Sequence, residues 1–352
     1  PRAGRQALRS GGFCKSLNYS SFSLLRGLAT AGLLCGAISL FAAETGNSPY
    51  IGRWALTIPG GGAGWLGVEA QPDGSLKGSL LWGGGSVLPV NETKVENGTL
   101  VVVRKHNRKK DGKDVQHVET ITAKLDGDRL ALVTRTVNEE GKEVGKAEFS
   151  GKKIPDLPPR PDLSKVKFGA PIPLLNGKDL TGWKVMNDKA PNCWSVADGI
   201  LSNRVTGPDG KKQHGTNIRT EREFEDFNLK TDVRVPANGN SGIYLRGIYE
   251  VQVAESYGKP CDSHHMGALY SRITPAVAAE KPAGEWQTLD ITLVDRHLTV
   301  ILNGKTIIDN QPVLGCTGGA MTSDEFKPGP IYLQGDHTDV DYRNMILTPI
   351  VK

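Results

Sequence analysis

Short runs of alternating apolar and polar residues, each ended by a turn sequence, recur from about residue 48 to the end of the chain. Two examples are "RLALVTRTV" and "WQTLDITLV", and the turns include Asp198-Gly199 and Asn303-Gly304. Asp-Gly and Asn-Gly pairs favour the type I′ turns that join antiparallel strands. No long stretch has the 3.6-residue period of an amphipathic helix. The sequence therefore predicts an all-β protein built from antiparallel hairpins.

Prolines are concentrated in the segment 154–173, "IPDLPPRPDLSKVKFGAPIP". Proline cannot sit in a central strand, so this segment is predicted to be an extended linker. It separates a small antiparallel β-barrel or sandwich, residues 48–153, from a larger domain, residues 174–350. "Gly52-Arg53-Trp54" resembles the G-x-W signature of lipocalin-like barrels, so we interpret the first domain as a small lipocalin-like β domain. The larger domain is predicted to be an antiparallel jelly-roll sandwich with one face open to a ligand.

The first 43 residues differ in composition from the rest of the chain. They contain five basic residues and no acidic one, which accounts for the whole formal net charge of +5. The apolar run "LLRGLATAGLLCGAISLFAA" (24–43) predicts a secretory signal peptide over 1–43, with a single membrane anchor as the alternative. Cleavage would leave no stable membrane span and a periplasmic or secreted protein. The remaining chain has balanced charges, which argues against a nucleic-acid partner.

Three cysteines follow the predicted signal peptide, at wide spacing: Cys193, Cys261 and Cys316. This arrangement is not a disulfide framework, although one pair with one buried thiol is compatible with it. No CxxC or other zinc-binding spacing occurs.

The segment "NSGIYLRGIYEVQV" (240–253) is interpreted as one strand with two unlike faces. One alternating set, Ile243, Leu245, Tyr249, Val251 and Val253, is apolar and should enter the core, because buried apolar area stabilises by about 25 cal/mol per Å². The other, even-numbered face is either the solvated back of a sheet or the floor of a site. We favour a site, because "IYLQGDH" (331–337) repeats the arrangement. This face carries Tyr244, Arg246, Ile248, Glu250 and Gln252 in the first segment and Tyr332, Gln334 and Asp336 in the second, which ends in His337.

Six ordered blocks resemble one family. They are "PLLNGKDLTGW", "W-S-V-x-D-G", "NSGIYLRGIYEVQV", "GALY", "KPAGEWQTLDI" and "GPIYLQGDHTDVDYRN", spanning about 174–350. In order and spacing the chain is similar to the 3-keto-disaccharide hydrolase domain family. The resemblance implies a concanavalin-like lectin/glucanase sandwich and an exported, glycan-degrading protein. It also implies cleavage of sugars already oxidised at C3, downstream of a sugar 3-dehydrogenase.

Cleavage of a 3-keto-glycoside by elimination and hydration needs a base for the C2 proton, a donor at the C3 oxygen and an acid for the leaving group. Glu250 and His337 are the base and acid candidates, in either order, and Arg246 is the candidate oxyanion partner. The sequence identifies no certain cofactor. A divalent metal that polarises the ketone is compatible with His337, Glu250 and Asp336, although no spacing rule demands one. The predicted substrate-binding residues are Asn240, Tyr244, Gln252, Gln334 and Asp336.

Two alternatives remain open at the level of sequence. A lectin-like fold is also compatible with a non-catalytic carbohydrate-binding protein. "Glu250-x-Gln252-x-x-Glu255" resembles the catalytic strand of retaining glucanases, which need two carboxyl groups about 5–5.5 Å apart on one face. Residues 250 and 255 have opposite parity, so Glu255 reaches that face only through a bulge.

Overall fold

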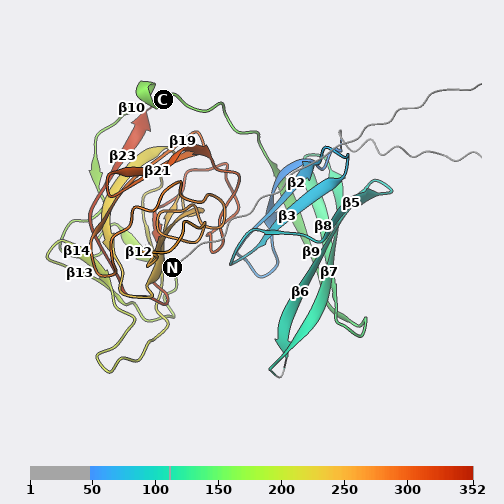
Figure 1. The fold of residues 1–352 in the computed structure, drawn as a ribbon, viewed down its shortest axis with the longest axis horizontal. Coiled ribbons are helices and arrows are strands. Elements are labelled where there is room, and N and C mark those ends of the chain that lie inside the picture. Colours follow the sequence, from blue (N-terminus) through green and yellow to red (C-terminus); the bar gives the residue numbers. More distant parts are fainter. Residues whose placement is uncertain (1–47, 111, 352) are drawn as a thin grey trace, which may run out of the picture. The chain divides into compact units, whose positions relative to one another are not determined.

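The computed structural model describes residues 48–110 and 112–351 of the 352-residue chain, and the predicted signal peptide lies outside them. The described residues fall within one compact unit and form two β domains (Figure 1). Within that part of the chain, no helix has the length and apolar character needed to span a membrane. The all-β prediction is confirmed.

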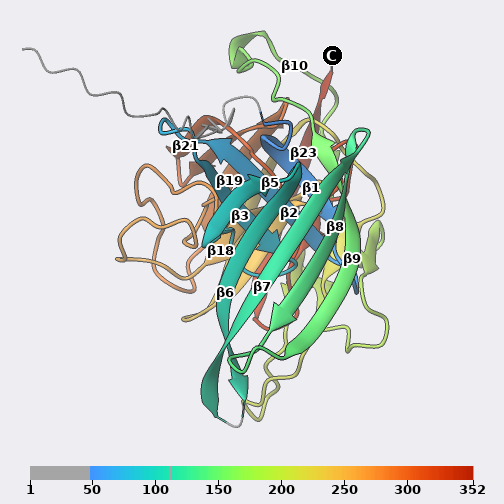
Figure 2. The same cartoon turned by 90° about the vertical axis from the view of Figure 1, so that its right-hand side faces the viewer.

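The first domain is a curled antiparallel sheet. Its long strands lie side by side in Figure 2. Among the described residues the order is β4-β3-β2-β1-β9-β8-β7-β6-β5, so the strands at the two ends follow each other in the chain. Val90 N–H donates to Gly78 C=O at 3.1 Å, and Asn91 N–H donates to Val103 C=O at 2.8 Å. These bonds tie the connection between β4 and β5 to both β3 and β6, which curls the sheet into a half-barrel. The strands are β1 Gly52–Thr57, β2 Ala63–Ala70, β3 Leu76–Trp82, β4 Leu88–Pro89, β5 Glu92–Glu96, β6 Thr99–Lys110, β7 Lys113–Asp126, β8 Arg129–Val137 and β9 Glu143–Ile154.

Both faces of β1 and β2 are largely buried, for different reasons. Trp54 lies inside the half-barrel with Leu66, and its Nε1–H donates to Tyr50 C=O at 2.9 Å. Ala55 and Trp65, on the opposite face, pack into the core of the second domain. The two β domains therefore share part of one apolar core.

The second domain is a two-layer sandwich. Its smaller sheet has the order β12-β15-β22-β17-β18, and its larger sheet runs β13-β14-β23-β16-β19-β20-β21. The strands of the smaller sheet are β12 Trp183–Val185, β15 Ile218–Thr220, β22 Tyr332–Leu333, β17 Asn240–Leu245 and β18 Tyr249–Ala254. Those of the larger sheet are β13 Trp194–Ala197, β14 Ile200–Asn203, β23 Val340–Val351, β16 Phe227–Arg234, β19 Gln287–Val294, β20 His297–Leu302 and β21 Lys305–Pro312.

The predicted hairpin turns are confirmed. Asp198 and Gly199, which join β13 to β14, have φ values of 52° and 75°. Asn303 and Gly304, which join β20 to β21, have φ values of 51° and 81°. Positive φ at both central residues is what a type I′ turn requires.

The predicted linker is only partly a linker. A 3-10 helix at Leu163–Lys165 interrupts it, and its last part pairs with β23 through β10 Lys167–Phe168 and β11 Ile172–Pro173. Proline is tolerated there because these two-residue strands are additions to the sheet rather than central strands.

The three cysteines of the described region are all free. Cys316 is buried, Cys193 is half-buried and Cys261 is exposed. The disulfide that the sequence left open is therefore not formed.

Candidate functional site

The segment 240–253 is a hairpin and not the single strand predicted from the sequence. Arg246 and Gly247 have φ values of 55° and 68°, and Ile248 N–H donates to Leu245 C=O at 3.1 Å, which closes a type I′ turn. β17 then pairs with β18, with Leu245 opposite Tyr249. Because residues of the same parity face each other across this hairpin, even-numbered residues of both strands still share one face.

The odd-numbered face enters the sandwich core, as predicted. Ile243, Leu245, Tyr249, Val251 and Val253 are all fully buried there. The opposite face carries Tyr244 directly across from Glu250, and Gly242 across from Gln252. Tyr332 of β22 lies beside Tyr244 on the other side.

Glu250 is the central group of this face. A Cβ at position 242 would lie 2.2 Å from Glu250 Oε1, so the carboxyl group occupies space that only glycine leaves open. The side chain is 3% exposed. Burial raises the pKa of Glu250 to about 8; the neighbouring Tyr244 hydroxyl group opposes this rise, and the nearby charge of Asp336 adds to it.

A chain of hydrogen bonds runs from the centre of this face to its edge. Gln252 Nε2–H donates to Asn240 Oδ1 at 3.2 Å, and Asn240 Nδ2–H donates to His337 Nε2 at 3.3 Å. His337 Nδ1 in turn lies 2.6 Å from Asp336 Oδ1. The structure therefore brings together four predicted site residues from three separate segments.

Asp336 and His337 act on each other's ionisation. The hydrogen bond to Asp336 raises the pKa of His337, with desolvation opposing it. For Asp336, burial by itself would raise the pKa, but the hydrogen bond and charge of His337 outweigh it and the pKa is lowered. At the exposed edge of the face, Asp336 and His337 therefore favour each other's charged form.

Arg246 does not lie on this face, so its predicted place among the residues of the face is wrong. Its guanidinium donates to the carbonyl oxygens of Glu325 at 2.9 Å and Lys327 at 3.1 Å. It also lies 5.8 Å from the centroid of the Tyr249 ring. The reason is the turn at residues 246–247, which removes Arg246 from the alternation of the strand. Arg246 anchors the loop 325–327.

Two further residues belong to the site: Tyr332, which the sequence placed on this face without a role, and Asn217, which it did not predict. The Tyr332 ring stacks on Tyr244 with centroids 4.2 Å apart, and its hydroxyl accepts a hydrogen bond from Asn217 Nδ2 at 2.9 Å. Burial raises the pKa of Tyr332, so it keeps its proton. The alternation in "IYLQGDH" signals Tyr332; nothing local signals Asn217, which is 115 residues away in the chain.

Two loops border the face on its other sides. The first, residues 264–271, runs along β18, where His264 C=O accepts from Gln252 Nε2 at 3.1 Å and Tyr270 N–H donates to Glu250 C=O at 2.9 Å. The second, residues 317–319, lies over Tyr244, whose hydroxyl donates to Gly318 C=O at 2.8 Å.

Gln334 and Glu255 are the remaining residues that the sequence singled out. Gln334 follows β22, half-buried, and its N–H donates to Gly242 C=O at 3.0 Å. Glu255 lies just beyond the end of β18 and pairs with Lys259 at 3.5 Å. It is therefore committed elsewhere, which removes the basis for a retaining carboxyl pair with Glu250. Among the described residues, His, Cys, Asp and Glu form no group of three able to hold a metal ion.

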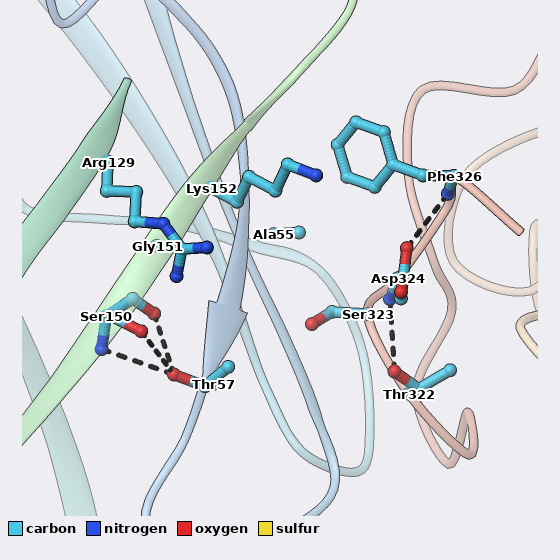
Figure 3. A pocket seen from close by; sticks show the side chains of 10 residues that line it. All are labelled: Ala55, Thr57, Arg129, Ser150, Gly151, Lys152, Thr322, Ser323, Asp324 and Phe326. Atoms are coloured by element: carbon cyan, nitrogen blue, oxygen red, sulfur yellow. Dashed lines mark hydrogen bonds between the residues drawn. The ribbon is translucent and has the colours of Figure 1, made fainter. Parts of the chain in front are cut away.

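A separate cavity of about 250 Å³ lies where β1 and β9 meet the loop 322–326. Figure 3 shows Lys152 directed toward Phe326, with its Nζ 3.9 Å from the ring centroid. Ser323 Oγ–H donates to Leu56 C=O at 2.8 Å beside it. None of the predicted site residues lines this cavity, so we regard it as a junction between the domains and the face around Glu250 as the candidate site.

The second domain thus has a concanavalin-like two-sheet sandwich fold, with a buried carboxyl group on one polar face. The chain belongs to the family of 3-keto-alpha-glucoside-1,2-lyase-like domains, whose sequence profile matches residues 170–348. This confirms the family that the sequence blocks predicted.

Among curated proteins, the chain is 26% identical over 148 residues to a 3-keto-disaccharide hydrolase of Bacteroides thetaiotaomicron. The match covers 34% of this chain and 51% of that protein, so the chain spans about half the length of its relative.

Two solved structures are similar in part. A candidate glycosyl hydrolase from Parabacteroides distasonis is 28% identical with a TM-score of 0.41, covering 55% of this chain and 93% of that one. A carbohydrate binding module from Bacillus subtilis is 13% identical with a TM-score of 0.33, covering 48% and 95%.

Proposed function

We propose that this protein cleaves 3-keto-glycosides, including 3-keto-disaccharides, by removal of the C2 proton, elimination at C1 and hydration. The observation that carries the proposal is the Glu250 carboxyl group, which is buried over Gly242 on the polar face of the smaller sheet. Its pKa of about 8 makes it a stronger base than an ordinary carboxylate, close to a useful working pH.

The proposed reaction has three stages: removal of the C2 proton, elimination at C1 and hydration. The ketone at C3 acidifies the C2 hydrogen, and the Glu250 carboxylate takes that proton while the C2–H electron pair forms an enolate. The enolate re-forms the C3 carbonyl, a C1=C2 double bond forms, and the C1–O bond breaks with its electrons on the leaving oxygen. His337 gives that oxygen a proton. Water then adds across the double bond, with oxygen at C1 and a proton at C2, and the net reaction is hydrolysis.

Tyr332 takes the part that the sequence assigned to Arg246. Its hydroxyl already accepts from Asn217, so its own proton is available to the C3 oxygen as negative charge develops there. Its raised pKa keeps the proton in place. A fixed donor of this kind is typically worth about 10²–10³-fold in rate.

The residues at the edge of the face suit sugar hydroxyl groups. Asn240, Gln252, Gln334 and Asp336 offer amide and carboxylate groups there, and Gln252 Oε1 is buried with no hydrogen-bond partner among the described residues. Such an acceptor calls for a donor, which a sugar hydroxyl or a water molecule supplies. The substrate would be produced by a sugar 3-dehydrogenase, and we propose a periplasmic or secreted location.

The decisive test is incubation of the full chain with a 3-keto-glucoside carrying a chromogenic aglycone, beside the unoxidised glucoside. We expect release of the aglycone from the keto-sugar alone, and no release at any pH would refute the proposal. Calorimetry with both sugars identifies the non-catalytic alternative. Tight binding of the unoxidised glycan without turnover would indicate a carbohydrate-binding protein.

A further inference from the structure

A loop of the first domain reaches the two loops that border the candidate site. The glycine loop, residues 83–87, connects β3 to β4 and has the sequence "GGGSV". Gly83 C=O accepts from Gly319 N–H at 3.2 Å, and Ser86 Oγ lies 2.8 Å from His264 Nε2. Val87 N–H donates to Ser271 Oγ at 2.8 Å. The glycine loop therefore contacts both loops that border the candidate site, 264–271 and 317–319.

These two loops hold the floor of the site directly. In the loop 317–319, Gly318 C=O accepts from the Tyr244 hydroxyl, and Thr317 Oγ1 accepts from Glu250 N–H at 2.9 Å. In the loop 264–271, the backbone of His264 accepts from Gln252 Nε2. Each of the two loops is thus hydrogen-bonded both to a predicted site residue and to the first domain.

We propose that the first domain is a working part of the candidate site, with the glycine loop as a positioning element that fixes Tyr244 and Gln252 through the two bordering loops. The effect on turnover rests on the function proposed above. The positioning itself rests only on the contacts around Glu250.

The contact with the loop 317–319 is too close for any residue but glycine. A Cβ at position 318 would lie 1.9 Å from Gly85 C=O, so the two backbones touch. On the other side, Asp262 Oδ1 lies 2.7 Å from His264 Nδ1, so Asp262 and Ser86 hold the imidazole at both nitrogens.

The glycine loop follows a strand that is packed into the core of the sandwich. Trp65 and Leu81 of β2 and β3 pack into the sandwich core, and Arg272 of the sandwich lies 4.5 Å from the centroid of the Trp65 ring. A loop anchored by a shared core transmits strain instead of yielding, because packed interiors have low compressibility.

The test compares two Gly→Ala substitutions. Gly318→Ala places a methyl group against the Gly85 backbone, whereas Gly84→Ala, in the same region, places it where nothing lies within 4 Å. Neither glycine has a positive φ, so space is the difference between them. We expect Gly318→Ala to lift the loop 317–319, hydrate Glu250 and lower its pKa by about 1 unit, with Gly84→Ala unchanged.

The pKa of Glu250 is read from the carboxyl ¹³C resonance, assigned by its loss in Glu250→Gln. The other titratable groups that act on Glu250 are Tyr244, Tyr332, Tyr342 and Asp336, and all are retained in these variants. We also expect kcat of Gly318→Ala to fall about 10-fold or more relative to Gly84→Ala, on the scale of a misplaced catalytic group.

A milder pair of variants covers the case in which Gly318→Ala does not fold. Ser86→Ala removes the hydrogen bond to His264, and Ser86→Thr keeps a hydroxyl group there. We expect Ser86→Ala to lower the Glu250 pKa by about 0.3 unit and Ser86→Thr to restore it. The pKa of Glu250 in Gly84→Ala is the reference value. If Ser86→Ala has the same Glu250 pKa as this reference, and any folded Gly318→Ala has it as well, the inference is overturned. If the wild type fails to turn over keto-sugars, the proposed function is lost, but these pKa measurements still decide the positioning.

Discussion

Replacement of Glu250 by Gln keeps the shape of the side chain and removes its ionisation. In the folded protein the pKa of Glu250 is about 8, against an ordinary value of 4.5. Between these two pH values the folded state binds more protons than the unfolded state, so the wild type loses stability as the pH rises through this window. One pKa unit corresponds to about 1.4 kcal/mol. The full shift therefore amounts to on the order of 5 kcal/mol, as an upper limit.

We expect Glu250→Gln to match the wild type in stability near pH 4 and to exceed it by about 2–5 kcal/mol above pH 8. Urea unfolding at a series of pH values measures this difference. In the same variant kcat should fall by about 10²-fold or more, the usual scale for loss of a general base. For the wild type, kcat/KM should rise with pH through an apparent pKa near 8, because the base must be ionised.

Opposite results would refute the reasoning. A variant that is less stable than the wild type at every pH, with turnover kept, would make Glu250 a structural carboxyl group. An activity that falls as the pH rises through 8 would make Glu250 the acid, and the base would then be His337.

Three further substitutions test the rest of the site. Tyr332→Phe should lower kcat by about 10²-fold and leave KM nearly unchanged, since it removes a donor needed as the enolate forms; an unchanged kcat would exclude that role. Gly242→Ala places a methyl group 2.2 Å from Glu250 Oε1 and should abolish turnover in a folded protein, as judged by circular dichroism. Arg246→Ala should cost about 2–4 kcal/mol in urea unfolding, because it leaves buried loop carbonyls unpaired, and a loss of activity at full stability would instead return Arg246 to the chemistry.

Local pattern in the sequence predicted much of the fold. Alternation with a period of two marks strands, and Asp-Gly or Asn-Gly pairs mark type I′ turns, because both are set by the backbone conformation of a few neighbouring residues. The two faces of residues 240–253 followed from the same alternation. The ordered blocks of the second domain also identified the family.

The hairpin at Arg246-Gly247 was not predicted from the sequence. Arginine is not a typical residue for positive φ, and alternation looks the same in one strand as in a hairpin whose partners share parity. The reversal was therefore invisible locally, and it decided that Arg246 leaves the site.

The composition of the site beyond Glu250 was set by pairing between distant segments. Asn217 meets Tyr332 only because β15 and β22 are neighbours in one sheet, and Ser86 meets His264 only because two domains share a core. Strand order and domain packing depend on how apolar faces fit together over the whole molecule, which no short stretch of sequence contains. The sequence by itself determined the strands, their faces and the carboxyl group; the tertiary structure decided which residues surround that group.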